Sequence, residues 1–272
     1  MRARRRFGQH FLEPAWARRL VAALAPDPTD VFVEVGPGRG ALTIPLAAAV
    51  RRVVAVELDR DLVTWLEPRL PSNATLVSGD VLQTPLTVLL PADVDPGAAR
   101  MVGNLPYNIS TPILFRLLEW RRTADAFRDA TVMLQREVAE RIAARPGTKA
   151  YGVLSVAIQM EASVTPLLAL PPGAFRPAPD VSSSVVRLDF HPPAVAVDDR
   201  VAFDRVVKGV FMHRRKTLAN ALKAAADGRD LDTPAVLRSA GIDPGRRPET
   251  LTLGEFAALA NRITAARQAP VV

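Results

Sequence analysis

The sequence predicts an α/β protein whose C-terminal part is entirely helical. An apolar run at residues 31–35 is followed at once by a glycine-rich turn at 36–40 and a helical pattern at 41–50. Further apolar runs alternate with helical patterns, which is typical of a mostly parallel sheet covered by helices. Beyond His191-Pro192-Pro193 the spacing of apolar residues is helical throughout. We therefore expect two domains, residues 1–192 and 193–272.

Composition limits the class of protein. With 272 residues, of which 49% are hydrophobic and 23% charged, the chain can bury a large core. It has no Cys, which excludes disulfides and thiolate chemistry, and its three His are far apart, so we expect no metal site. No apolar run approaches a membrane span, and no signal-peptide pattern follows the N-terminal Arg residues. We expect a cytoplasmic protein without membrane contact, and nothing requires more than a monomer.

Positive charge is concentrated at the two ends of the chain. The net charge is +7, but residues 1–24 carry +5 and residues 200–272 carry +6, which leaves −4 for the middle. This pattern favours a nucleic acid partner held by the ends. The alternative is an Arg-rich composition spread over solvated faces. Arg214, Arg215 and Lys216 stand at a predicted helix start, where the helix dipole disfavours cations, so we assign them to RNA phosphates.

The first segments before the sheet are a loop and a helix. Residues 7–12 form an apolar loop that contains glycine, and Pro14 stands where a helix can start, with apolar residues following at helical spacing. The loop alone predicts either a packed N-terminal lid or simply the start of the helix.

The glycine turn indicates a nucleotide-containing cofactor. Gly36 and Gly38 would let the backbone approach a ligand closely. The turn also satisfies Gly-x-Gly-x-x-Ala, so a dinucleotide fold is a competitor. S-adenosylmethionine is favoured because Glu34 places a carboxylate beside the turn, which suits a cationic amine or sulfonium better than a pyrophosphate. Pro37 also removes an N–H that a phosphate cradle would use.

Two further acids follow predicted strands. Glu57 ends the run 52–56 and lies 23 residues after Glu34, the usual distance to an acid that binds ribose hydroxyls. Asp80 follows the run 74–78 and could accept the adenine amine of a cofactor, although Gly-Asp is also a common turn. Residues 82–98 contain several prolines and predict a surface connection.

The fourth predicted strand ends at the central motif of the predicted site, Asn104-Leu105-Pro106-Tyr107. The exocyclic amine of adenine is a poor nucleophile because its lone pair is delocalised into the ring. The Asn104 amide oxygen and the Leu105 carbonyl could accept its two N–H bonds, while Pro106 fixes the chain. Tyr107 offers a ring on which a base can stack. The alternative is an ordinary strand-to-turn junction.

The remaining segments complete the predicted sheet. A fifth strand at 130–134 leads into a helix, a loop at 145–152 and a short helix at 153–159, and residues 163–170 and 184–190 predict a final strand pair. Between these strands, Phe175 lies in a loop stiffened by prolines and could form a wall for a flipped base. The alternative is a proline-rich connector with one buried anchor.

Taken in order, these motifs resemble the ribosomal RNA adenine N6-dimethyltransferases, most of all the bacterial enzymes that act on small-subunit RNA. The resemblance covers roughly residues 5–265. His10 stands where the family usually has Asn, and Asp180 and Ser182 stand where a Lys and an Asp are common. The matching segments are 7–12, 34–38, 57–59, 103–110, 134–139, 151–156, the Phe175 loop, 214–217 and 241–244.

The resemblance implies a seven-stranded Rossmann-like class I methyltransferase sheet and a small all-helical C-terminal domain that binds RNA. It implies S-adenosylmethionine as donor and two adjacent adenines of the 3′-terminal hairpin as targets, each methylated twice during ribosome biogenesis. The resemblance also implies that seven residues contact the cofactor. They are Gln9, His10, Leu12, Gly36, Glu57, Asp80 and Asn104.

Three other functions are alternatives to the small-subunit RNA dimethyltransferase that the resemblance implies. A large-subunit RNA dimethyltransferase would share the core and differ in substrate. A ribosome-assembly factor would bind immature subunits, with methylation secondary. A nicotinamide oxidoreductase offers no account of the Asn104 motif.

Overall fold

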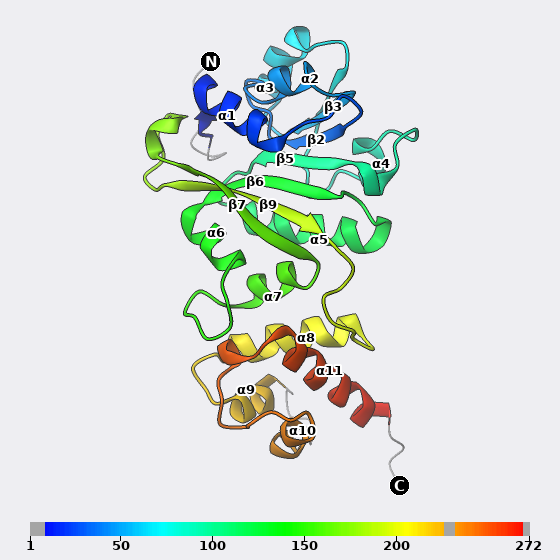
Figure 1. The fold of residues 1–272 in the computed structure, drawn as a ribbon, viewed down its shortest axis with the longest axis vertical. Helices are drawn as coiled ribbons and strands as arrows, with labels where there is room; N and C mark the ends of the chain where they lie inside the picture. Colours follow the sequence, from blue (N-terminus) through cyan, green and yellow to red (C-terminus); the bar gives the residue numbers. More distant parts are fainter. Residues whose placement is uncertain (1–8, 226–231, 269–272) are drawn as a thin grey trace. The chain divides into compact units, whose positions relative to one another are not determined.

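In the computed structural model, which describes residues 9–225 and 232–268, seven strands form one mixed sheet (Figure 1). Their order is β4-β3-β2-β5-β6-β9-β7; the first five are parallel, and β9 is antiparallel to β6. The predicted α/β fold and seven-stranded sheet are thus confirmed. The strands are β2 (Val31–Val35), β3 (Arg52–Glu57), β4 (Ala74–Ser78), β5 (Arg100–Asn104), β6 (Asp129–Gln135), β7 (Ala162–Leu170) and β9 (Ser183–Phe190).

The order of the strands reverses between β2 and β5. The chain extends the sheet from β2 through β3 to β4, and then returns to place β5 on the other side of β2. In open α/β sheets, ligands bind at the carboxyl ends of the strands at such a switch point. Gly103 allows the close approach there, because a β-carbon at this position would lie 2.8 Å from the carbonyl oxygen of Val35.

Strand register places two of the predicted site residues on one face of the sheet. Glu34 aligns with Val102, and Asn104 is two residues further along β5, so their side chains project to the same face. The helices α1 (Pro14–Leu24) and α2 (Thr43–Ala47) share a core cluster with Phe32 and Val102 of this face. The helix predicted at 41–50 is shorter than expected, since α2 spans only Thr43–Ala47.

Three more helices accompany the strands of this part of the chain. They are α3 (Arg60–Leu66), α4 (Leu86–Leu89) and α5 (Ser110–Ala124). The single turn of α4 lies in the predicted surface connection. α5 starts directly after the Asn104 motif and buries Ile113, Leu114, Leu117 and Leu118, which share one side at helical spacing. This anchored helix fixes the end of the motif.

The N-terminal segment forms a strand, where the sequence predicted a lid or the start of the helix. β1 (Phe11–Leu12) pairs antiparallel with β8 (Phe175–Arg176). Leu12 aligns with Phe175, and the Arg176 guanidinium contacts the Glu13 carboxylate at 3.0 Å. The two-stranded pair holds residues 9–12 against the glycine turn.

The chain divides into two compact units. The first comprises Met1–Ala139 and Ser163–Phe190, and the second Glu140–Ala162 and His191–Val272. Residues 140–162, which lie in the first predicted domain, group with the second unit. Tyr151, Val156 and Met160 are buried in a core cluster with Phe203 and Phe256 of the second unit. Apolar pattern alone does not show which core a helix joins.

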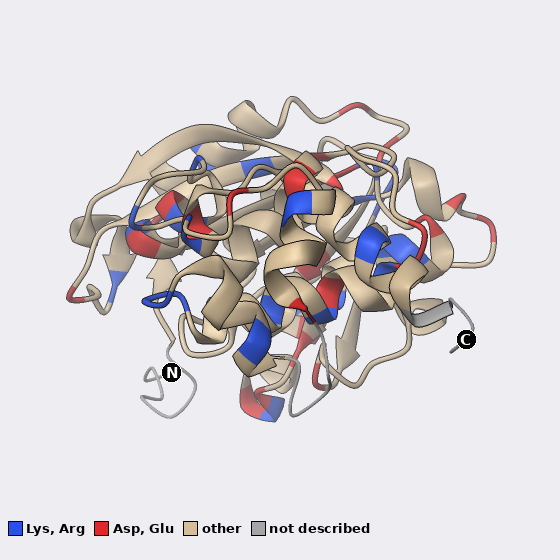
Figure 2. Cartoon of the chain, turned by 90° about the horizontal axis from the view of Figure 1, so that it is seen from below, with Lys and Arg blue, Asp and Glu red and all other residues tan. Residues whose placement is uncertain are grey.

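The described regular elements beyond Phe190 are all helical, as expected. Figure 2 shows Lys and Arg (blue) and Asp and Glu (red) on many of the elements. The remaining helices are α6 (Arg136–Ile142), α7 (Val153–Gln159), α8 (Arg200–Met212), α9 (Leu218–Ala225), α10 (Thr233–Ser239) and α11 (Leu253–Gln268).

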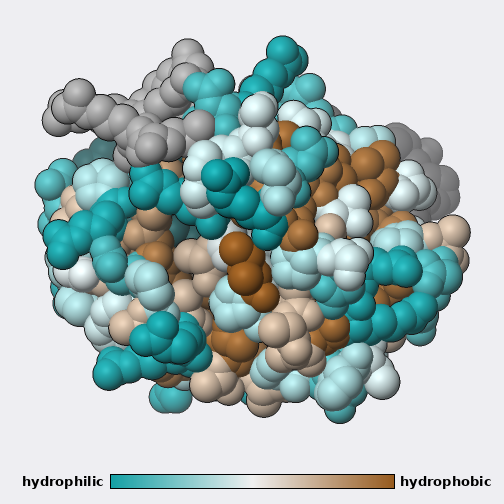
Figure 3. Space-filling view, turned by 90° about the horizontal axis from the view of Figure 1, so that it is seen from above, coloured by the Kyte–Doolittle hydropathy of each residue, from teal (hydrophilic) through white to brown (hydrophobic). Residues whose placement is uncertain are grey.

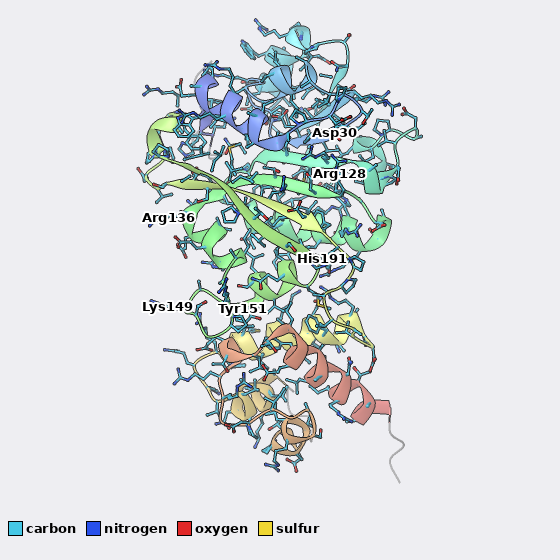
Figure 4. All side chains as sticks on the ribbon, viewed as in Figure 1. Asp30, Arg128, Arg136, Lys149, Tyr151 and His191 are labelled. Atoms are coloured by element: carbon cyan, nitrogen blue, oxygen red, sulfur yellow. The ribbon has the colours of Figure 1, made fainter. Side chains whose placement is uncertain are left out.

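A buried ion network fixes the starts of β5 and β6, at the opposite strand ends from Asn104. Arg100 is only 3% exposed and contacts Asp30 at 2.8 Å and Asp129 at 2.9 Å. Arg128 approaches Asp30 at 2.8 Å (Figure 4). Since a buried charge is costly unless paired, these contacts are structural.

No helix within residues 9–225 and 232–268 is long and apolar enough to cross a membrane. On the face drawn in Figure 3, hydrophilic residues (teal) and apolar residues (brown) are interspersed.

Candidate active site

A cavity of about 310 Å³ opens at the carboxyl ends of β2, β3, β4 and β5. This is the switch point of the sheet, and the volume lies at the lower end of the range for small-ligand sites. Every residue predicted to bind the cofactor or act in catalysis lines it. These residues are Gln9, His10, Leu12, Gly36, Gly38, Glu57, Asp80, Asn104, Leu105, Pro106 and Tyr107.

The glycine turn and Glu57 form one wall of the cavity. Gly38 has φ of +58°, and a β-carbon there would lie 3.1 Å from the ring of Phe11. The Gly38 N–H donates to Glu57 Oε2 at 3.1 Å, and the Asp59 N–H donates to Glu57 Oε1 at 2.9 Å. Burial raises the pKa of Glu57, and these two hydrogen bonds oppose the rise. The carboxylate is thus held in one orientation at the cavity wall.

Glu34 is the most perturbed acid in this cavity wall. Its side chain is 2% exposed, and burial, assisted by the charge of Glu57, raises its pKa to about 7. The nearby Thr43 hydroxyl opposes the rise, but neither its Oγ1 nor Glu34 Oε2 has a hydrogen-bond partner of ordinary geometry among the described residues. An unpartnered buried carboxyl oxygen at a cavity is suited to a cationic or hydrogen-bond-donating ligand group.

Asn104, at the end of β5, has its amide oriented by the N-terminal segment. Its Nδ2 donates to the main-chain carbonyl of His10 at 2.7 Å. Because a carbonyl can only accept, the amide nitrogen must face residue 10, and the amide oxygen Oδ1 points the other way. The Leu105 N–H donates to Met133 at 3.3 Å, which fixes the following backbone.

Tyr107 is held at both its hydroxyl and its ring. The hydroxyl is hydrogen-bonded to Ser183 Oγ at 2.5 Å, and burial raises the pKa of Tyr107. The His10 imidazole stacks on the phenol ring, with centroids 5.5 Å apart and planes inclined by 23°. His10 Nδ1 donates to the carbonyl of Pro177 at 2.8 Å. The ring that was predicted to receive a base is thus in contact with His10.

Phe175, predicted to form a wall for a flipped base, is completely buried in this structure. Its side chain lies in a core cluster with Leu12 and Leu20 and does not line the cavity. The burial follows from its pairing with Leu12 in the small sheet. A role for Phe175 in holding the base stays a prediction.

The predicted RNA-binding cations lie in the second unit and do not line the cavity. Arg214 is partly buried and donates to the Lys149 carbonyl at 3.1 Å, whereas Arg215 and Lys216 are exposed. Their role in RNA binding stays a prediction.

Sequence reasoning missed the partners that hold these residues. Asp59 caps α3 by accepting from the Asp61 N–H at 3.1 Å, and it also accepts from Gln9 Nε2 at 2.8 Å. Ser183 and Pro177 were likewise not foreseen. These contacts join residues 50 or more positions apart, and no local pattern marks them.

The prediction of no metal site stays a prediction. Within the described ranges, no group of three or more His, Cys, Asp or Glu side chains is placed to hold a metal ion.

Comparison with known proteins relates the whole chain to one family. Residues 1–265 match the family model described as ribosomal RNA adenine dimethylase. A Vibrio cholerae protein named ribosomal RNA small subunit methyltransferase A is 44% identical over 271 residues, which cover 97% of this chain and 94% of the relative. A protein of the same name from Nitrosococcus oceani is 47% identical over 262 residues, 95% of each chain.

Solved structures support the fold. A dimethyladenosine transferase from Plasmodium falciparum superposes with a TM-score of 0.75 at 23% identity, over 92% of this chain and 96% of that one. The 23S rRNA methyltransferase ErmE gives 0.65 at 24% identity, over 93% and 99%. The full-length sequence matches exclude the nicotinamide oxidoreductase alternative. Motifs, cavity and relatives agree: the chain belongs to the ribosomal RNA adenine dimethylase family and is an adenine-methylating enzyme.

Proposed function

We propose that this protein dimethylates N6 of two adjacent adenines in the 3′-terminal hairpin of small-subunit ribosomal RNA, with S-adenosylmethionine as methyl donor. The observation that carries the chemistry is Asn104, whose amide oxygen is directed away from residue 10 at the edge of a cavity that also contains the Tyr107 ring. The substrate is supported by the relatives, which are named as small-subunit methyltransferases and match nearly the whole chain.

The cavity suits S-adenosylmethionine by its chemistry. The buried, unpartnered oxygen of Glu34 would accept from the ammonium group, and the fixed carboxylate of Glu57 would accept from the ribose hydroxyls. The turn between Gly36 and Gly38 leaves room for a ligand against the backbone. Once bound, S-adenosylmethionine would supply a methyl group activated by a sulfonium.

The protein's own contribution is mainly positioning. The Asn104 amide oxygen and the Leu105 carbonyl would accept the two N–H bonds of the target amine and direct its lone pair into the cavity. No general base is required next to the nitrogen, because the amine loses its proton after it has become cationic. Leu105 and Leu12 are buried apolar residues of the cavity lining, and apolar surroundings favour a reaction in which charge is dispersed.

RNA binding is assigned to the exposed cations of the second unit. Arg215 and Lys216 are exposed beside the partly buried Arg214, as phosphate-binding side chains must be. Such contacts release counterions, so affinity should fall steeply as salt rises.

The direct test is methyl transfer from labelled S-adenosylmethionine to undermethylated small subunits and to large-subunit RNA, followed by mapping of the modified base. We expect N6,N6-dimethyladenine at two adjacent positions near the 3′ end of small-subunit RNA. Label only in large-subunit RNA would retain the chemistry and overturn the substrate. Tight binding to subunits without any label would favour an assembly factor.

A further inference from the structure

Residue 10 contacts both groups that a target adenine has to contact. Its main-chain carbonyl accepts from Asn104 at 2.7 Å, and its imidazole lies on the Tyr107 ring with centroids 5.5 Å apart. Under the proposed function, on which this inference rests, the adenine amine must reach Asn104 while the base stacks on Tyr107. The His10 imidazole therefore covers the ring on which the base would stack, while its main-chain carbonyl contacts the amide nitrogen of Asn104 and not the oxygen that would accept from the amine.

A base cannot enter between the two rings as they stand. Each stacked contact needs a carbon-to-carbon separation of roughly 3.5–4 Å, so a base between two rings would require about 7–8 Å between them. The observed centroid distance of 5.5 Å, at an inclination of 23°, leaves no such gap. Either His10 leaves the Tyr107 ring or the base does not stack there.

The imidazole is also tethered on its other side. His10 Nδ1 donates to the Pro177 carbonyl in the loop that follows β8. The ring thus bridges this loop and the motif, while the main chain of residue 10 is held separately by Asn104. A rotation of the side chain alone can release Tyr107 and leave the orientation of the Asn104 amide intact.

We propose that the His10 imidazole is a placeholder for the target base. It covers Tyr107 in the free enzyme, and the flipped adenine displaces it on binding. Tyr107 lines the cavity and is covered by the imidazole, so its ring is the stacking surface that the displacement releases. Loss of one aromatic stacking pair corresponds to a two- to roughly tenfold change in an equilibrium constant, which sets the expected size of the effect.

The first test measures the dissociation constant for a hairpin RNA of the 3′-terminal small-subunit sequence, with S-adenosylhomocysteine present at saturation. His10→Ala and His10→Asn, which remove the ring but keep the carbonyl to Asn104, should bind the hairpin two- to roughly tenfold more tightly than wild type. His10→Phe keeps a ring for Tyr107 but lacks the bond to Pro177, and should not gain affinity. Weaker or unchanged binding by both His10→Ala and His10→Asn would overturn the placeholder.

The second test uses the wild-type protein, so it does not depend on the folding of a variant. The chain has only three His, which makes their ring proton signals simple to assign by NMR. In the free enzyme the His10 ring protons should be displaced by the ring current of Tyr107, and the displacement should disappear when the hairpin is saturating. A matched hairpin with abasic sites at the two target positions should bind and leave the displacement in place.

The outcomes separate this inference from the proposed function. If the wild type methylates the hairpin but the His10 signals stay displaced in the complex, the placeholder is wrong and the function stands. If the wild type neither binds nor methylates the hairpin, the proposed function fails and the placeholder falls with it.

Discussion

Replacement of Glu34 by Gln should stabilise the protein selectively at alkaline pH. Burial raises the pKa of this carboxyl from 4.5 to about 7. At about 1.4 kcal/mol for each factor of ten in the dissociation constant, ionising Glu34 in the folded protein costs roughly 3 kcal/mol more than in the unfolded chain. The folded state binds the Glu34 proton more tightly than the unfolded chain does. The stability that the bound proton confers on the fold is therefore fully present below pH 4.5 and is lost as pH rises through about 7.

Urea denaturation at pH 5 and at pH 8.5 would measure the effect. A neutral Gln does not titrate, so the free energy of unfolding of Glu34→Gln, relative to wild type, should rise by roughly 2–3 kcal/mol between the two pH values. Glu67→Gln, at an exposed position, controls for the loss of one carboxylate. A difference between Glu34→Gln and wild type that is the same at both pH values would refute the burial argument.

The same variant tests the assignment of Glu34 to the cofactor amine. A hydrogen bond to a charged group contributes about 1.5–3 kcal/mol, so Glu34→Gln should bind S-adenosylhomocysteine roughly 10–100-fold more weakly at pH 8. Calorimetric titration would measure this, and unchanged affinity would show that Glu34 serves only the fold.

Three further sets of substitutions test separate parts of the protein. Asn104→Ala should abolish methyl transfer yet retain hairpin binding, because it removes an acceptor for the amine and no phosphate contact; near wild-type turnover would contradict the mechanism. The double variant Arg215→Ala, Lys216→Ala should reduce the slope of log affinity for RNA against log salt concentration by about 1.5. Filter binding at several salt concentrations would measure this slope. An unchanged slope would show that RNA phosphates bind to other residues. Arg100→Ala should lower the free energy of unfolding by about 3–5 kcal/mol, since it leaves buried carboxylates unpaired, whereas Arg128→Ala, at a half-exposed side chain, should cost under about 1 kcal/mol. Equal effects in urea denaturation would refute this assignment.

The sheet and most of the cavity could be predicted from sequence because both depend on local order along the chain. Apolar runs fix the strands, and parallel strands bring their carboxyl ends to one edge. Glu34, Glu57, Asp80 and Asn104 each lie at or just after a strand end, so their convergence follows from the fold class alone.

The sequence could not show the surroundings of residues whose packing depends on a contact between distant parts of the chain. Phe175 is an aromatic residue in a proline-rich loop, and its sequence context is equally compatible with an exposed wall and a buried anchor. Its pairing with Leu12, 163 positions away, puts it in the core. Residues 140–162 similarly have an ordinary amphipathic pattern, and only the position of Tyr151 among the helices of the second unit shows which core they complete.

The N-terminal segment contacts both sides of the cavity. Gln9 donates to Asp59 beside the Glu57 wall, and residue 10 contacts Asn104 and Tyr107 on the base side. The His10 imidazole is held by its stacking contact with Tyr107 and by a hydrogen bond to Pro177, each of which contributes about 1 kcal/mol net. The β1–β8 pair and the main-chain contact with Asn104 hold the rest of the segment. The segment can therefore orient Asn104 while its imidazole gives way to a base.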